Sequence, residues 1–301
     1  MPDRTTIAYR AGSAVARALP APVIAELARV GGAAAGRLDA TRRAQVERNL
    51  RRVHGQDFGG RALRRAVTAT FESYARYWAE SFRLPGTSPE ALDASMSHVG
   101  YGYIDDALAA GNGAILATPH LGAWEWGGCW VASVKHHPVS AVVEALEPRE
   151  VFEWFAELRG RMGVQVIPLG PEAGTGVMRA LKANHVVCLF CDRDVAGGGI
   201  EVEFFGERTR LPAGPATLAL RTGAPILPTA VYLDGARHCG VVRAPLAVER
   251  QGRFRADVAR ITQALACELE ALIRVAPEQW HLMQPNWPSD PGYVQASRSE
   301  P

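Results

Sequence analysis

The stretch Ala114-Ile-Leu-Ala-Thr-Pro-His-Leu-Gly-Ala-Trp-Glu125 joins an apolar run to a histidine that stands five positions before a glutamate. The aliphatic run over 114–118 predicts a buried strand, and residues 123–134 have the pattern of a helix. His120 then lies at the carboxyl end of a strand, the edge at which open α/β sheets bind ligands. This stretch therefore predicts an α/β fold with a functional group at the edge of its sheet.

The spacing of His120 and Glu125 limits how the two side chains can meet. Five residues of an ideal helix turn through about 500°, which would point the two side chains about 140° apart. They can face each other only if His120 lies in the loop before the helix, and Pro119 and Gly122 favour such a loop. A histidine held by a carboxylate is a general base for a hydroxyl. The alternative is a histidine that caps the helix and a glutamate that stabilises its first turn through the helix dipole.

From residue 100 onward, apolar strands alternate with helical segments. Strands are expected at 114–118, 139–143, 164–168, 186–191, 201–205, 226–232 and 240–244, and helices at 101–110, 123–134, 150–161, 174–183, 213–222 and 257–275. Such alternation predicts a mostly parallel central sheet flanked by helices. No repeat or linker marks a boundary, so we expect a single domain with an α/β core over 85–285 and a loose C-terminal tail over 286–301.

Residues 1–84 have the pattern of an N-terminal helical segment that belongs to the same domain. Pro22 suits the start of a helix and Gly31-Gly32 suits its end. Residues 61–82 carry an aromatic stripe at helical spacing, which is expected to pack in the core; the alternative is that it forms one wall of an apolar ligand pocket.

Charge is unevenly distributed along the chain. Residues 1–80 carry 14 arginines against 7 acidic residues, whereas the remainder carries 19 basic and 24 acidic residues. A basic amphipathic N-terminus suggests an anionic partner, either lipid headgroups or nucleic acid, and can lie on a membrane surface; an ordinary solvated helix face is the alternative. No apolar stretch reaches the roughly 20 residues that span a bilayer. Because no signal peptide is evident either, we expect a cytoplasmic protein that reaches a membrane only peripherally.

The cysteines and the common nucleotide motifs point to no cofactor. Cys188 and Cys191 share an apolar strand, where residues three apart face opposite sides, so core cysteines are expected rather than metal ligands. The five cysteines have no framework spacing, which fits a reducing compartment. No Gly-x-Ser-x-Gly elbow, Walker loop or dinucleotide fingerprint is present.

Charged residues follow several of the predicted elements. Asp192 and Asp194 come directly after the strand at 186–191, and either could reach His120 at the same sheet edge; the alternative is a turn closed by an Asp–Arg pair. Residues 204–215 have the pattern of a Gly and Pro loop that contains Arg210 and leads into a helix, where anions can bind. Arg159 ends the helix at 150–161, where the helix dipole alone would accommodate it.

These pieces, in this order, resemble the bacterial lipid A biosynthesis (lauroyl/myristoyl) acyltransferase family, within the lysophospholipid acyltransferase superfamily. The likeness is closest to its actinobacterial branch, the phosphatidylinositol mannoside acyltransferases. The matching stretches are Arg48-Asn-Leu50, Thr118-Pro-His-Leu-Gly-Ala-Trp-Glu125, Arg159 to Gly163, Cys191-Asp-Arg-Asp194, Glu203-Phe-Phe-Gly206, Leu211-Pro-Ala-Gly-Pro215 and Pro277-Glu-Gln-Trp280.

The resemblance implies roles for the matched residues. His120 would be the base that deprotonates the acceptor hydroxyl, with Glu125 and Asp192 as the other catalytic residues. Glu125 fills a position that is often Asp in relatives, and Asp192 falls where the mannoside acyltransferases carry Glu. Arg159 matches an arginine near the acyl donor, and Arg210 and Trp124 are further candidates for substrate binding.

The expected activity is transfer of a fatty acyl chain from acyl-CoA, a co-substrate, to a mannose hydroxyl of phosphatidylinositol mannoside. It would take place on the cytoplasmic face of the cell inner membrane, on a peripheral protein, without cofactor, metal or nucleic acid. One alternative is acylation of another lipid, such as a lipid A precursor or a lysophospholipid. Two others are a thioesterase that activates water at His120 and a non-catalytic lipid-binding protein. The sequence leaves open the acyl chain length and whether CoA or acyl carrier protein is the donor.

Overall fold

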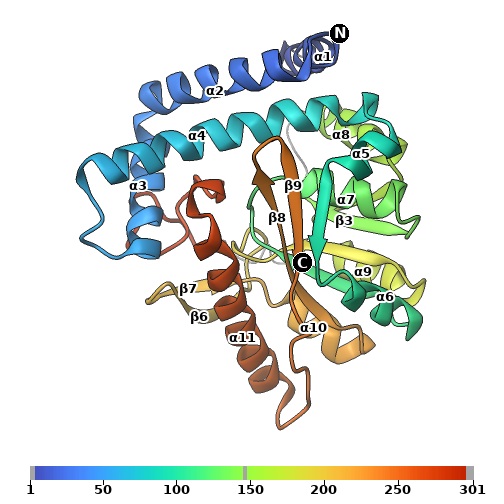
Figure 1. Ribbon diagram of the computed structural model, residues 1–301. Helices are drawn as coiled ribbons and strands as arrows, with labels where there is room; N and C mark the ends of the chain where they lie inside the picture. The colour runs from blue at the N-terminus through green and yellow to red at the C-terminus, as the bar shows by residue number, and fades with distance from the viewer. Residues whose placement is uncertain (1–3, 145–147, 296–301) are drawn as a thin grey trace.

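The computed structural model describes residues 4–144 and 148–295, in which helices surround a central sheet (Figure 1). The seven-stranded sheet has the order β1-β9-β8-β2-β5-β3-β4. Its strands are β1 (Met96–Val99), β2 (Ala114–Thr118), β3 (Val139–Val143), β4 (Val164–Pro168), β5 (Val186–Phe190), β8 (Ile226–Asp234) and β9 (Arg237–Val242). All neighbours run parallel except β8 and β9. The expected α/β class with a mostly parallel sheet is confirmed.

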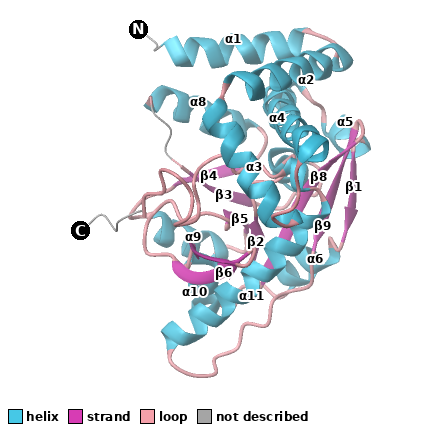
Figure 2. Cartoon of the chain, turned by 90° about the vertical axis from the view of Figure 1, so that its left-hand side faces the viewer, coloured by secondary structure: helices cyan, strands magenta, loops and turns pink. Residues whose placement is uncertain are grey.

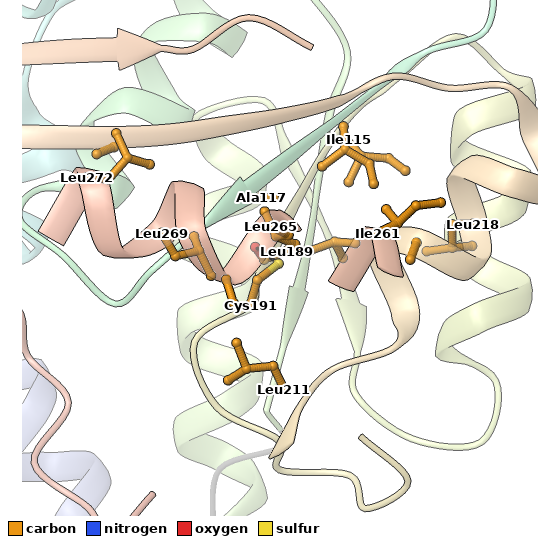
Figure 3. Packing of buried hydrophobic residues seen from close by; sticks show 14 of the residues in the cluster. Ile115, Ala117, Leu189, Cys191, Leu211, Leu218, Ile261, Leu265, Leu269 and Leu272 are labelled. Atoms are coloured by element: carbon orange, nitrogen blue, oxygen red, sulfur yellow. Dashed lines mark hydrogen bonds between the residues drawn. The ribbon is translucent and has the colours of Figure 1, made fainter. Parts of the chain in front are cut away.

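Alternate residues of the central strands face opposite layers of helices. On β2, Ile115 and Ala117 join one core, whereas Ala114 and Leu116 join the other. The first face is covered by α9 (Ala173–Lys182), α10 (Gly214–Thr222) and α11 (Phe254–Val275), and Figure 3 shows part of this core. The second is covered by α5 (Pro89–Ala94), α6 (Gly102–Ala109) and α7 (Trp124–Ser133). Because both faces are buried, the strands are continuous apolar runs that the sequence makes visible.

The N-terminal segment forms four helices: α1 (Arg4–Ala18), α2 (Ala21–Leu38), α3 (Ala40–His54) and α4 (Gly60–Arg83). Figures 1 and 2 show α1 and α2 at one end of the molecule, beside α4. The predicted helix end at Gly31-Gly32 is wrong, since α2 continues to Leu38. A Cβ at Gly32 would lie 2.5 Å from the carbonyl oxygen of Phe71, so this glycine lets α2 approach α4 closely. No helix of the described residues is long and apolar enough to cross a membrane.

Residues 204–215 do not form the expected continuous loop. Strand β7 (Glu207–Leu211) pairs with β6 (Ile200–Phe204) in an antiparallel hairpin. Thr209 and Leu211 are buried while Arg208 is exposed and Arg210 half-buried, a period of two that is the signature of a strand. Strand β1 could not be predicted either. Three of its four residues are exposed, so it has no buried apolar run that would mark it in the sequence.

The expected loose tail does not begin at residue 286. Trp287 is fully buried, and the buried carboxylate of Asp290 accepts hydrogen bonds from Gln45 and Arg52 of α3. These partners are more than 200 residues away in the sequence, so the local Pro, Ser and charge content is misleading. The remaining elements are α8 (Arg149–Arg161) and the short 3-10 helices η1 (Leu84–Gly86) and η2 (Pro277–Gln279).

Candidate active site

His120 and Asp192 meet at the carboxyl edge of the sheet. Strands β2 and β5 pair with Thr118 opposite Phe190, and two residues further along each chain stand His120 and Asp192. The His120 Nδ1 lies 2.7 Å from Asp192 Oδ1, and the His120 backbone N–H donates to Oδ2 at 3.0 Å. Asp194, the other residue that the sequence offered as a partner, instead accepts the Gly199 N–H at 2.7 Å.

The carboxylate of Asp192 is completely buried but well supplied with donors. Burial raises the pKa of Asp192, but the charge of His120 and hydrogen bonds from His120 and Trp280 outweigh burial and hold the pKa below its ordinary value. An ionised Asp192 favours the tautomer with the proton on Nδ1, which leaves a lone pair on Nε2. The His120 side chain is 36% exposed, so water or a bound molecule can reach the imidazole.

The sequence had suggested that Glu125 holds His120, but the structure shows no contact between the two side chains. The Glu125 carboxylate accepts hydrogen bonds from Arg159 Nε at 3.0 and 3.2 Å and from Arg159 Nη2. His120 does lie in the loop before α7, as expected, but Glu125 points from the first turn of α7 toward the last turn of α8. Asp192 occupies the position beside His120 that was predicted for Glu125. The catalytic assignment of Glu125 thus has no support in a contact with His120.

The Glu125–Arg159 pair forms a buried link between two helices. Both side chains are at least nine-tenths buried, and the Arg159 guanidinium carbon lies 5.6 Å from the Trp124 ring and 5.5 Å from the Phe155 ring. Burial alone would lower the pKa of Arg159, but Glu125 outweighs burial and raises it. The guanidinium is therefore committed to Glu125, and substrate binding by Arg159 remains a prediction.

An apolar pocket lies next to His120. The Phe190 ring stacks on the imidazole with 4.2 Å between ring centroids, and Phe190 lines the pocket together with Trp124 and Thr118. The pocket lies between the second face of the sheet, α6 and α7. Its further lining includes Met96, Ile104, Leu116, Val139, Val164 and Val186. The lining of this pocket suits an apolar ligand.

Two cysteines lie on opposite faces of β5 and its continuation, as the sequence predicted. Cys188 lines the apolar pocket, whereas Cys191 belongs to the first core. Burial raises the pKa of the Cys188 thiol to about 12, so this thiol stays protonated and is a poor nucleophile. Among residues 4–144 and 148–295, no three His, Cys, Asp or Glu side chains are grouped to hold a metal ion.

Other predicted and unpredicted residues complete the surroundings. Arg210 lies on β7, where its Nη1 donates to the Gly199 carbonyl at 3.1 Å, and it does not line the apolar pocket. The sequence indicated no role for Trp280, whose indole N–H donates to Asp192, or for His281, whose backbone N–H donates to the His120 carbonyl at 2.7 Å. Burial and the charge of His120 lower the pKa of His281 to about 3, so His281 is neutral. The only signal for these two residues was the Pro277-Glu-Gln-Trp280 stretch.

The chain matches known proteins over most of its length. Residues 2–289 match the family described as bacterial lipid A biosynthesis acyltransferase. A phosphatidylinositol mannoside acyltransferase of Mycobacterium tuberculosis (strain H37Rv) is 38% identical over 291 residues, which is 95% of this chain and 89% of that protein. The protein of the same name from Mycolicibacterium smegmatis is 37% identical over 292 residues, 95% of this chain and 92% of its own length. The matched region includes both strands that present His120 and Asp192, and the chain belongs to the bacterial lipid A biosynthesis acyltransferase family.

Proposed function

We propose that this protein transfers a fatty acyl chain from acyl-CoA to a mannose hydroxyl of phosphatidylinositol mannoside, with His120 as the general base. The observation that carries the proposal is the His120–Asp192 pair beside an apolar pocket, in a chain from an acyltransferase family. The pocket would hold the acyl chain, and the stacked Phe190 would bring the thioester to the imidazole. The choice of acceptor rests on the names of the mycobacterial relatives.

In the proposed reaction, His120 Nε2 takes the proton of the acceptor hydroxyl while the hydroxyl oxygen attacks the thioester carbonyl carbon. The tetrahedral intermediate then collapses and the carbon–sulfur bond breaks. The protonated imidazole returns its proton to the departing CoA sulfur, so the products are an ester and a thiol and the base is regenerated. Asp192 stabilises the imidazolium between the two steps. The thioester is already activated, so alignment and proton transfer are sufficient and no acyl-enzyme is needed.

We place the reaction at a membrane surface, with the N-terminal helices as the contact. Helices α1 and α2 expose Ile7, Val15, Val23, Leu27, Val30 and Leu38 to solvent, each at least 45% exposed. A groove between α2, α3 and α4 is lined by Arg37, Arg43, Arg61, Arg64 and Arg65, against two acidic residues. Exposed apolar side chains and arginines on one helical segment match the interface between acyl chains and anionic headgroups of a bilayer.

The test combines the purified protein with palmitoyl-CoA, with and without phosphatidylinositol dimannoside. Free CoA and the lipid product are followed by mass spectrometry for the wild type, His120→Ala and Asp192→Asn. We expect an acylated mannoside from the wild type and a loss of at least a hundredfold in rate in both variants, because each removes part of the base. Asp194→Asn is the matched control and should keep the wild-type rate, since Asp194 contacts the Gly199 N–H instead of His120.

Two outcomes would count against the proposal. CoA release that is the same with and without the lipid would indicate a thioesterase, a reaction that the 36% exposure of His120 permits because water can reach the imidazole. Transfer to a lysophospholipid or a lipid A precursor, but not to the mannoside, would retain acyl transfer and replace the acceptor.

A further inference from the structure

Trp280 takes no part in the reaction described above, yet its indole reaches the partner of the base. Its Nε1 donates to Asp192 Oδ2 at 2.8 Å. The same oxygen accepts the His120 backbone N–H at 3.0 Å, whereas Oδ1 lies 2.7 Å from His120 Nδ1. The two donors on Oδ2 fix the plane of the carboxylate and keep Oδ1 directed at the imidazole. The carboxylate torsion would otherwise be broad and soft.

Trp280 is itself held on two sides. Its backbone forms an antiparallel bridge with Leu121, the residue that follows His120. Its ring packs tilted on Phe205 and edge-on against Phe204 and Trp287, with centroids 5.6, 6.1 and 6.2 Å away, and only 3% of the residue is exposed. A side chain so immobilised presents its N–H in one place, and holding Asp192 costs it little additional conformational entropy.

We propose that Trp280 is a positioning residue that orients Asp192, and through Asp192 holds His120 in the orientation needed for proton transfer. The inference rests on the proposed function in so far as His120 is the base. A hydrogen bond to a carboxylate is roughly twice as strong as one between neutral groups. In metal sites, the partners that orient a ligating histidine change affinity or activity by about 10- to 100-fold when they are removed. The orienting chain here has the same form, with Trp280 acting on Asp192 and Asp192 on His120.

The variant Trp280→Phe keeps an aromatic ring in the cluster and removes the N–H. Trp287→Phe is a closely matched control, because Trp287 belongs to the same cluster, is fully buried, and its Nε1 donates at 3.2 Å to the Phe204 carbonyl, which does not contact His120 or Asp192. Both variants lose one indole N–H and leave a similar small void. They differ in whether the lost hydrogen bond was made to Asp192.

In acyl-transfer kinetics, Trp280→Phe is expected to lower kcat at least tenfold while KM for palmitoyl-CoA stays within about twofold of the wild type. Trp287→Phe is expected to keep kcat within about threefold, with a similar midpoint of thermal unfolding. Equal losses of kcat in the two variants would reduce Trp280 to a packing role. An unchanged kcat in Trp280→Phe would remove the proposal altogether.

A second measurement does not depend on the activity. In protein labelled with ¹⁵N-histidine, the ring resonances of His120 are assigned by their disappearance in His120→Gln. We expect the Nδ1 resonance to move in Trp280→Phe and to stay at its wild-type position in Trp287→Phe. If the wild type transfers no acyl group but the resonance behaves in this way, the proposed function fails while the positioning by Trp280 stands. If the Nδ1 resonance keeps its wild-type position in Trp280→Phe, the positioning inference fails even when acyl transfer is found.

Discussion

At the scale of single residues, His120 and Glu125 show that two members of one short motif can have separate partners. His120 leaves β2 and faces Asp192 across the sheet edge, whereas Glu125 turns inward from α7 to Arg159. The first contact leaves an imidazole nitrogen free for chemistry. In the second contact the buried charges of Glu125 and Arg159 compensate each other. We therefore expect Glu125 to act mainly by holding α7 against α8.

The Glu125–Arg159 pair leads to a prediction about stability. Glu125→Gln leaves a buried arginine without its counter-charge, and such losses cost about 3–5 kcal/mol in the free energy of unfolding. The double variant Glu125→Leu/Arg159→Met removes both charges and should recover most of this loss. Urea unfolding gives the free energy of unfolding of the wild type, the single variant and the double variant. Glu157→Gln, which breaks an exposed pair with Arg161, is the control and should cost less than about 1 kcal/mol. A double variant no more stable than the single one would contradict this account.

A pH dependence follows from the lowered pKa of Asp192. The pKa of this carboxyl in the folded protein lies below its ordinary value of 3.8, so the unfolded chain binds the proton more readily. Its contribution to the free energy of unfolding is thus present above about pH 3.8 and is lost as the pH falls through the folded value. We expect Asp192→Asn to show a shallower fall in stability than the wild type below about pH 4, in urea unfolding at successive pH values. Parallel curves for the two proteins would show that Asp192 does not contribute to acid unfolding.

At the scale of elements, helix α7 covers the apolar pocket and contains two adjacent glycines. Gly127 packs against Val231, where a Cβ would approach Val231 Cγ2 to 2.5 Å. Gly128 lines the pocket, and a Cβ there would meet no atom within 4 Å. The space beside Gly128 is thus available to a ligand because this position has no side chain.

We therefore expect Gly128→Leu to shorten the acyl chain that the protein accepts. The added side chain would occupy part of the pocket, so kcat/KM for palmitoyl-CoA should fall at least tenfold relative to that for octanoyl-CoA, as measured in parallel assays. Gly174→Leu is the control, because Gly174 is an exposed glycine on α9, away from the pocket lining, with the same open surroundings. An unchanged ratio between the two donors would mean that the acyl chain does not run past α7.

At the scale of the whole molecule, the apolar side chains of α1 and α2 and the arginine groove lie within the same helical segment. Leu27 and Val30 lie one turn apart on α2, and each is more than half exposed. Exposure of such apolar side chains to water is not favourable. At a bilayer surface they would be buried, and arginines of the same segment would attract anionic lipids.

We expect the protein to sediment with vesicles of phosphatidylcholine that contain phosphatidylinositol, and to bind less to phosphatidylcholine alone. Leu27→Asp/Val30→Asp should weaken this binding at least tenfold, since two apolar contacts are replaced by charges that the anionic surface repels. Val275→Asp, at an exposed residue at the end of α11, should bind as the wild type does. Equal binding of all three proteins would place the membrane contact elsewhere.

The sequence by itself determined the elements whose partners are local or repetitive. The strands that form the middle of the sheet are continuous apolar runs, so their positions and their parallel pairing could be predicted, and with them the edge that carries His120 and Asp192. The ordered motifs likewise indicated the family. Trp124 was named as a substrate-binding candidate, and it lines the pocket, although its role remains a prediction.

Only the tertiary structure decided which side chains meet. Whether Asp192, Asp194 or Glu125 would face His120 depended on the register of β2 against β5 and on the place of α8, neither of which leaves a periodic mark in the sequence. The same holds for Trp280, which contacts Asp192 from 88 positions away, and for Trp287 and its neighbours, which α3 holds in place. The physical reason is that periodicity records which side of an element is buried, whereas a specific polar contact depends on distances set by the packing of distant elements.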